Sequence, residues 1–143
     1  MEDPRIRKLA KFLINQAVSL QKDEKILLEL HGKQTGFLKA LIQEAYLAGG
    51  KPFVHIFDYE AEGALIEGST EEHMAEIASY ELAMMKDMDA YIDIRATDNI
   101  SVWNRIPDEK NASYRQFTLL NAVIIRNGLC FVTLMMLWLS WPE

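Results

Sequence analysis

The pattern that most constrains the fold of this chain lies in residues 25–57, where two short apolar runs flank a helical segment. Lys25–Leu30 and Pro52–Phe57 lack helical spacing, and the second is rich in aromatic and β-branched residues, which is typical of strands. Apolar residues within Thr35–Ala48 recur every three or four positions and predict a helix that ends at the glycine pair 49–50. A helix between two strands favours a parallel pair with a right-handed crossover. We therefore expect a single α/β domain, with a mainly parallel sheet of three or more strands and helices on both faces.

Further periodic segments on both sides of this unit extend the α/β pattern. They are a helix from Pro4 to about Ala17 capped by Asp3, a short helix over Glu60–Glu67, a helix capped by Ser69 or Thr70 that runs to about Met88, a strand over Asp89–Ile94, a polar loop over Arg95–Ile106, and a final helix over Glu109–Asn121.

Residues 122–143 differ from the rest because they are apolar without a helical or strand period. Leu129–Trp141 contains no charge, but a membrane span needs about 20 apolar residues, so no span is expected. The segment is consistent with a buried strand, a core helix or a partner surface. We divide the chain into an α/β domain, residues 1–121, and an apolar tail, residues 122–143. Burying each large apolar side chain is worth about 1.5–3 kcal/mol, so we expect a homo-oligomer that associates through this tail.

Composition narrows the class of protein. The chain has 143 residues and a formal net charge of −6, which disfavours nucleic acid and anionic membrane surfaces as partners. Its one cysteine, Cys130, excludes an intrachain disulfide and fits a reducing compartment. The first residues do not resemble a signal peptide, so the expected location is the cytoplasm.

The histidines of the chain do not form a known motif. The segment His31–Gly36 lies between a predicted strand and helix, but it lacks both the P-loop spacing and the dinucleotide fingerprint, which favours a structural turn over an anion site. His73 follows Glu72, but position 77 holds isoleucine where a zinc-protease helix needs a second histidine, so His73 is interpreted as an exposed helical residue. His55 is interpreted as a hydrogen-bonded sheet residue rather than a metal ligand.

Acidic residues between 58 and 76 are interpreted as a solvated helix face. Asp58 retains a functional alternative, because it stands at the carboxyl end of a strand, where open α/β sheets often bind ligands. Cys130 is interpreted as inert packing in an apolar stretch. These observations leave open a small ligand-binding module, with its site near Asp58 and His31, or a protein-interaction module.

Three segments together resemble a known family. Asp3–Ala10, Gly36–Gly49 and Tyr80–Ile92 are similar, in order and register, to the N-terminal domain of the thermophilic metallo-aminopeptidases, the family of aminopeptidase T and aminopeptidase S. Tyr80 stands where the family usually has tryptophan, and Thr97–Asn99 replaces a common Glu-Asn-Pro. The resemblance covers about residues 1–121 and consists of many weak matches rather than one catalytic motif.

The resemblance implies a cytoplasmic, dimeric exopeptidase that removes N-terminal residues from peptides. Such an enzyme uses two divalent metal ions, of the zinc, cobalt or manganese class, to polarise the scissile carbonyl and to activate water. In the family, the Glu, His and Asp ligands lie in a C-terminal catalytic domain that has no counterpart here. The resemblance therefore assigns no catalytic, cofactor-binding or metal-ligating residue to this chain, and implies that the chain alone lacks the catalytic metal pair and is inactive.

The resemblance also offers a hypothesis for the apolar tail. The family continues with Tyr-Pro-Asn/Thr, alternating alanines and Gln-x-Ala, whereas this chain reads Asn127–Glu143 without that pattern. A second reading frame that begins at the last base of the Asn127 codon can encode a family-like continuation. In that frame the codons of Met135-Met136 require an aspartate and those of Trp141-Pro142 require an alanine. We expect the tail from about Ala122 to be out-of-frame translation, which sequencing of the coding DNA would test.

Overall fold

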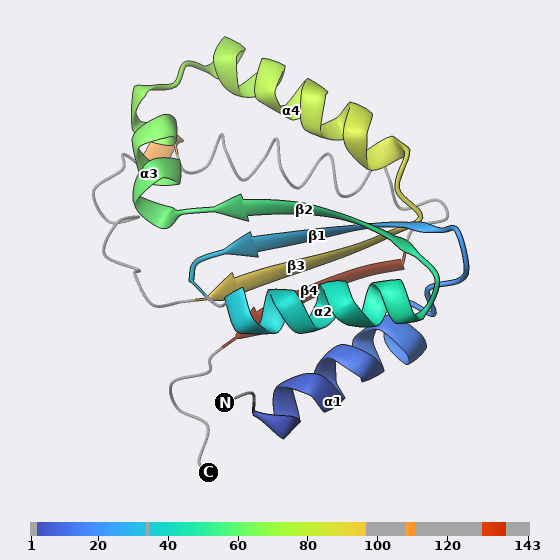
Figure 1. Ribbon diagram of the computed structural model, residues 1–143. Helices are drawn as coiled ribbons and strands as arrows, with labels where there is room; N and C mark the ends of the chain where they lie inside the picture. Colours follow the sequence, from blue (N-terminus) through green and yellow to red (C-terminus); the bar gives the residue numbers. More distant parts are fainter. Residues whose placement is uncertain (1–2, 34, 97–107, 111–129, 137–143) are drawn as a thin grey trace.

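A sheet of four parallel strands forms the centre of the protein in the computed structural model, which describes residues 3–33, 35–96, 108–110 and 130–136. The strands are β1 (Lys25–His31), β2 (Lys51–Phe57), β3 (Ala90–Ala96) and β4 (Cys130–Met136), in the spatial order β2-β1-β3-β4. Helices α1 (Pro4–Phe12) and α2 (Thr35–Leu47) lie on one side of the sheet, and α4 (Glu71–Lys86) lies on the other (Figure 1). This arrangement confirms the predicted α/β class.

The helices begin where their capping residues predict. The Asp3 carboxylate accepts the Arg5 N–H at 2.9 Å at the start of α1, and Thr70 caps α4. The predicted first helix changes its winding, because α1 is followed by a π-helical turn over Leu13–Ala17. α3 (Tyr59–Gly68) follows β2 after one residue, Asp58, and α4 ends at Lys86, slightly before the predicted end at Met88.

The core has two parts because side chains alternate between the faces of a strand. On the side of α1 and α2, the buried aliphatic side chains of the sheet pack under both helices. They are Ile26, Leu28, Leu30, Ile92 and Ile94. On the opposite side, Leu27 and Tyr91 pack against Met85 of α4 and against Met88, which follows the helix. The two strands β1 and β3 therefore bury side chains on both faces, as parallel strands generally do, whereas β2 has no fully buried residue.

Part of the apolar tail joins the sheet. Residues 130–136 form β4, which pairs in parallel with β3 from Ala90↔Cys130 to Ala96↔Met136. Arg95 and Ala96, expected in a loop, extend β3 instead. Most of the predicted helix Glu109–Asn121 and the rest of the tail lie outside the described residues, so the boundary between 121 and 122 stays a prediction. Within the described part of the chain, no helix is long and apolar enough to cross a membrane.

Candidate functional site

A row of polar side chains crosses the sheet on its α4 side. In the strand register, Glu29 of β1 lies between His55 of β2 and Asp93 of β3. His31 follows Glu29 on the same face of β1, two residues nearer the carboxyl end of the strand. The sheet thus brings two carboxylates and two imidazoles together from three strands.

The position of this row follows from the topology of the sheet. The chain leaves β1 through α2 and enters β2 on one side of β1, then passes through α3 and α4 and enters β3 on the other side. The strand order therefore reverses at β1, and the two crossovers lie on opposite faces (Figure 1). In open α/β sheets, ligands bind outside the carboxyl ends of the strands at such a switch point.

His31 is the centre of the cluster, which we define as Glu29, His31, Glu62 and Asp93. The His31 ring is buried, with 6% of the residue exposed. Its Nδ1 lies 3.1 Å from Glu62 Oε2, a carboxylate supplied by α3. Its Nε2 lies 3.3 Å from Asp93 Oδ1 and 3.8 Å from Glu29 Oε2. Both ring nitrogens therefore face carboxylates.

Two aromatic side chains fix the geometry of the cluster. The rings of His31 and Phe57 are stacked, with centroids 4.7 Å apart and planes only 10° from parallel. The Tyr91 hydroxyl donates a hydrogen bond of 2.6 Å to Glu29 Oε2. His55 Nδ1 lies 3.7 Å from the other Glu29 oxygen, at the less buried side of the cluster. The reactive groups are held by contacts from both neighbouring strands.

The surroundings shift the pKa values of the cluster in opposite directions. Burial lowers the pKa of His31, but the carboxylates of Glu29 and Glu62, with the charge of Asp93, outweigh it and raise this pKa to about 9. Burial raises the pKa of Glu29, but contacts with His31, His55 and Tyr91 outweigh it and lower this pKa to about 2. In the absence of a bound cation, His31 is therefore protonated and Glu29 is ionised at neutral pH.

A further carboxylate borders the cluster from α4. Burial, together with the negative charge of Glu29, raises the pKa of Glu81 to about 7. Contact with Glu29 also raises the pKa of His55, although partial burial opposes this shift. Glu81 therefore gives this side of the site a carboxylate that changes protonation near neutral pH.

The cluster has the chemistry of a metal-ligand set. Among the described residues, Glu29, His31 and Asp93 offer one ligand atom each, and these atoms all lie within 4.8 Å of one another. Carboxylate oxygen and imidazole nitrogen are ligands that divalent transition metals accept.

The structure separates the residues that the sequence singled out. His31 and His55 belong to or border the cluster, and His73 is exposed on α4, as interpreted. Asp58 instead caps α3, where its Oδ1 accepts the Ala61 N–H at 3.1 Å, so its role is structural. Cys130 is the first residue of β4.

Of the segment His31–Gly36, His31 ends β1, and Thr35 and Gly36 begin α2. Gly32 adopts φ +124°, which favours glycine, and its N–H donates to the Phe57 carbonyl at 3.0 Å. The turn ties the end of β1 to the end of β2, which fits the structural interpretation.

Sequence reasoning missed the carboxylates Glu29, Glu62, Glu81 and Asp93. The available signal was a charge inside an apolar strand, in Ile-Leu-Leu-Glu-Leu and in Tyr-Ile-Asp-Ile. A charged residue at a buried strand position needs a partner, so each such residue marks a polar site.

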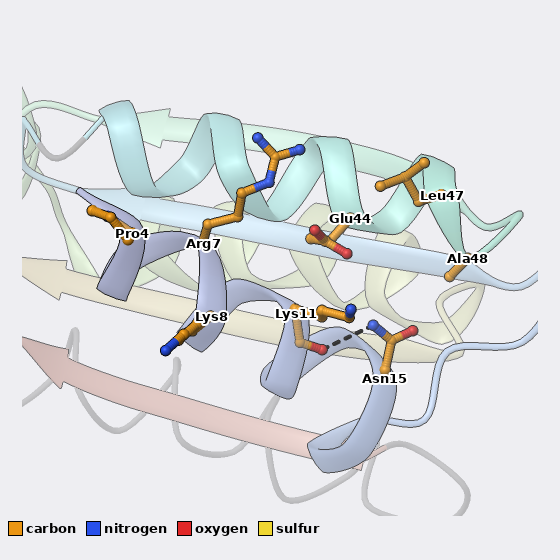
Figure 2. A pocket seen from close by; sticks show the side chains of 8 residues that line it. All are labelled: Pro4, Arg7, Lys8, Lys11, Asn15, Glu44, Leu47 and Ala48. Carbon is orange, nitrogen blue, oxygen red and sulfur yellow. Dashed lines mark hydrogen bonds between the residues drawn. The ribbon is translucent and has the colours of Figure 1, made fainter. Parts of the chain in front are cut away.

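A separate groove lies on the opposite side of the sheet, between α1 and α2 (Figure 2). Its lining residues are Pro4, Arg7, Lys8, Lys11, Asn15, Glu44, Leu47 and Ala48. Glu44 is buried among the basic side chains, and Asn15 Nδ2 donates to the Lys11 carbonyl at 2.9 Å. The lining therefore combines three basic side chains, those of Arg7, Lys8 and Lys11, with the single carboxylate of Glu44.

Comparison with known structures supports the fold. Wild-type AmpT from Thermus thermophilus matches with a TM-score of 0.71 and 17% sequence identity, over 95% of this chain and 36% of AmpT. The CurK enoyl reductase matches much more weakly, with a TM-score of 0.42 and 13% identity, over 92% of this chain and 42% of that protein. No match is found among curated proteins.

Comparison with protein families is more specific. The model of the thermophilic metalloproteases (M29) matches residues 2–127, which is most of the chain. The match includes α1 to α4 and the first three strands, and therefore every residue of the cluster. The chain belongs to the M29 family of thermophilic metalloproteases.

Proposed function

We propose that this chain is the N-terminal portion of a metal-dependent aminopeptidase, which removes N-terminal residues from peptides. The observation that carries the proposal is the M29 family match over residues 2–127. The likeness to AmpT supports the fold, and the chain spans 36% of the length of that protein. The resemblance in sequence to aminopeptidases T and S supplies the substrate class.

In this proposal, the catalytic metal pair is held by a C-terminal domain outside the sequence described here. The two divalent ions polarise the scissile carbonyl and lower the pKa of the attacking water. The 143-residue chain contributes the α/β portion and hydrolyses no peptide by itself. We further propose that the protein is cytoplasmic and that this chain self-associates through its tail.

The tail itself is proposed to be out-of-frame translation. The family match ends at residue 127, next to the point where the alternative frame begins. Sequencing the coding DNA should find a family-like continuation after a single-base change near codon 127. A continuous reading frame with no such continuation would overturn this part of the proposal.

The enzymatic proposal is tested with aminoacyl-nitroanilide substrates and added zinc, cobalt or manganese. We expect no hydrolysis by the purified 143-residue chain, and hydrolysis by the longer protein that the corrected frame encodes. AmpT serves as the positive control for each metal. Metal-dependent hydrolysis by the short chain, or none by the longer protein, would contradict the proposal.

A second candidate is a ligand-binding module, which the cluster at the switch point of the sheet favours. Three carboxylates in the cluster make nucleotides and other anions poor ligands there, because like charges repel. A thermal-shift comparison of nucleotides, phosphate and divalent cations would show which class of ligand the chain binds, since a specific ligand raises the melting temperature. Stabilisation by a divalent cation, and not by nucleotide or phosphate, is the result that the acidic cluster predicts for a binding module, and stabilisation by nucleotide would contradict it.

A further inference from the structure

The spacing of three donor atoms in the cluster fits a small divalent cation. His31 Nε2 lies 3.3 Å from Asp93 Oδ1 and 3.8 Å from Glu29 Oε2. With metal–ligand distances of about 2.0–2.2 Å, a tetrahedral site separates its ligand atoms by about 3.3–3.6 Å. The ligand oxygens of Glu29 and Asp93 lie within 4.8 Å of each other, so the two carboxylates must move closer together for all three atoms to share one ion.

The orientation of His31 suits a metal ligand. Glu62 lies 3.1 Å from Nδ1, which leaves Nε2 facing Asp93 and Glu29. Metal-binding histidines commonly donate the N–H of the other ring nitrogen to a carboxylate, which fixes the tautomer and the ring orientation. Stacking on Phe57 further restricts the ring plane.

The charge balance of the cluster also favours a cation. The side chains of Glu62 and Asp93 are each 3% exposed and that of Glu29 is 13% exposed, so three carboxylates surround one buried imidazole. Buried carboxylates are stable only when they are paired or coordinate a metal. A divalent ion compensates more of this charge than the single proton that His31 can carry.

The location provides an observation that does not depend on the side-chain distances. The cluster lies between β1 and β3, at the point where the order of the strands reverses. This is the general ligand-binding position of open α/β sheets.

We propose that Glu29, His31 and Asp93 bind one divalent transition-metal ion of the zinc class, with Glu62 as the residue that positions His31. The mixed nitrogen and oxygen donors favour Zn²⁺, Co²⁺ or Mn²⁺ over Ca²⁺ and Mg²⁺, which prefer oxygen alone. The ion joins β1, β3 and, through Glu62, α3. This site is separate from the catalytic metal pair and goes beyond the proposed function, so its failure would leave that proposal intact.

The first test is binding of Zn²⁺ to the metal-free 143-residue chain by isothermal titration calorimetry. We expect one ion per chain in the wild type. Glu62→Gln should weaken binding by about 10–100-fold, and His31→Gln by at least about 100-fold. The matched control is His73→Gln, at an exposed histidine of α4, which should bind as the wild type does. Absence of stoichiometric binding, or equal binding by His31→Gln, would overturn the proposal.

A second measurement does not depend on the folding of a variant. The chain has three histidines, so their ring nitrogens can be followed separately by ¹⁵N NMR during a Zn²⁺ titration of the wild type. We expect the His31 Nε2 signal to shift as the first equivalent is added, with His73 unchanged. Saturation without a change at His31, or a first response at His73, would contradict the site.

Discussion

Tyr91 supports the cluster through a single hydroxyl group. This hydroxyl donates to Glu29 Oε2 at 2.6 Å in a largely buried position. A hydrogen bond to a charged acceptor contributes about 1.5–3 kcal/mol, so Tyr91→Phe should lower the free energy of unfolding by about this amount. Urea unfolding of the metal-free chain would measure it.

The matched control is Tyr80→Phe, because Tyr80 is 78% exposed on α4. Its loss of a hydroxyl should leave the unfolding midpoint within error of the wild type. Equal effects of the two substitutions would show that the hydroxyl of Tyr91 is not important for stability.

Glu81 should make the stability of the chain depend on pH near neutrality. Burial and the charge of Glu29 raise its folded-state pKa to about 7, above the ordinary value of 4.5 for a glutamate. The folded chain therefore binds the proton more tightly than the unfolded chain. The stability linked to this group is fully present below the unfolded-state pKa and is lost as the pH rises through 7.

Glu81→Gln should remove this loss, because a neutral amide resembles the protonated acid. The variant should melt at a higher temperature than the wild type above pH 7, and the difference should shrink as the pH falls toward 4.5. Glu76→Gln, an exposed substitution on the same helix, should show no such trend. A constant difference at all pH values would contradict the explanation.

At the scale of residues, the sequence indicates which single residues stand out, but it does not predict which of them contact one another in the folded chain. His31 stands out next to a predicted strand and His55 within one. The alternation of β2 places the His55 side chain on the opposite face of the strand from Val54 and Ile56. The partners of His31 are not predictable from local spacing. Asp93 reaches it only because β3 pairs with β1, and Glu62 only because α3 starts beside the carboxyl end of β2.

The N-cap of α4 allows a prediction at the scale of one element. Thr70 Oγ1 accepts the His73 N–H at 3.2 Å. Thr70→Ala leaves this N–H without its cap and should lower the free energy of unfolding by about 1 kcal/mol. Chemical denaturation would measure the loss. Thr70→Ser keeps the hydroxyl and should recover most of the stability, whereas an equally unstable serine variant would argue against the capping hydrogen bond.

The existence of most elements is predictable from periodicity and capping residues. The structure confirms the strand–helix–strand unit with bounds shifted by about one residue. The π-helical turn over Leu13–Ala17 was not predictable, because apolar spacing does not distinguish a local change of winding. The pairing of β1 with β3 depends on contacts across the chain, which periodicity does not contain.

The fourth strand provides a prediction for the whole molecule. β4 covers the edge of β3 along seven residues, although the sequence of the tail shows no strand period. Deleting residues 122–143 removes β4 and leaves the hydrogen-bonding groups of β3 without this neighbour. An exposed strand edge promotes pairing with other chains. The truncated chain should therefore melt at a lower temperature, and any association that it shows should run through the exposed edge of β3 instead of the tail.

Deletion of residues 137–143 is the control, because it retains β4 and should preserve the melting temperature of the full chain. Light scattering and thermal unfolding of the full chain and of the two deletions would show whether the tail completes the sheet or is not needed for folding. If the tail completes the sheet, only the deletion of residues 122–143 should lower the melting temperature. A longer deletion with an unchanged melting temperature would contradict the stabilising role of β4 and would show that residues 1–121 fold independently.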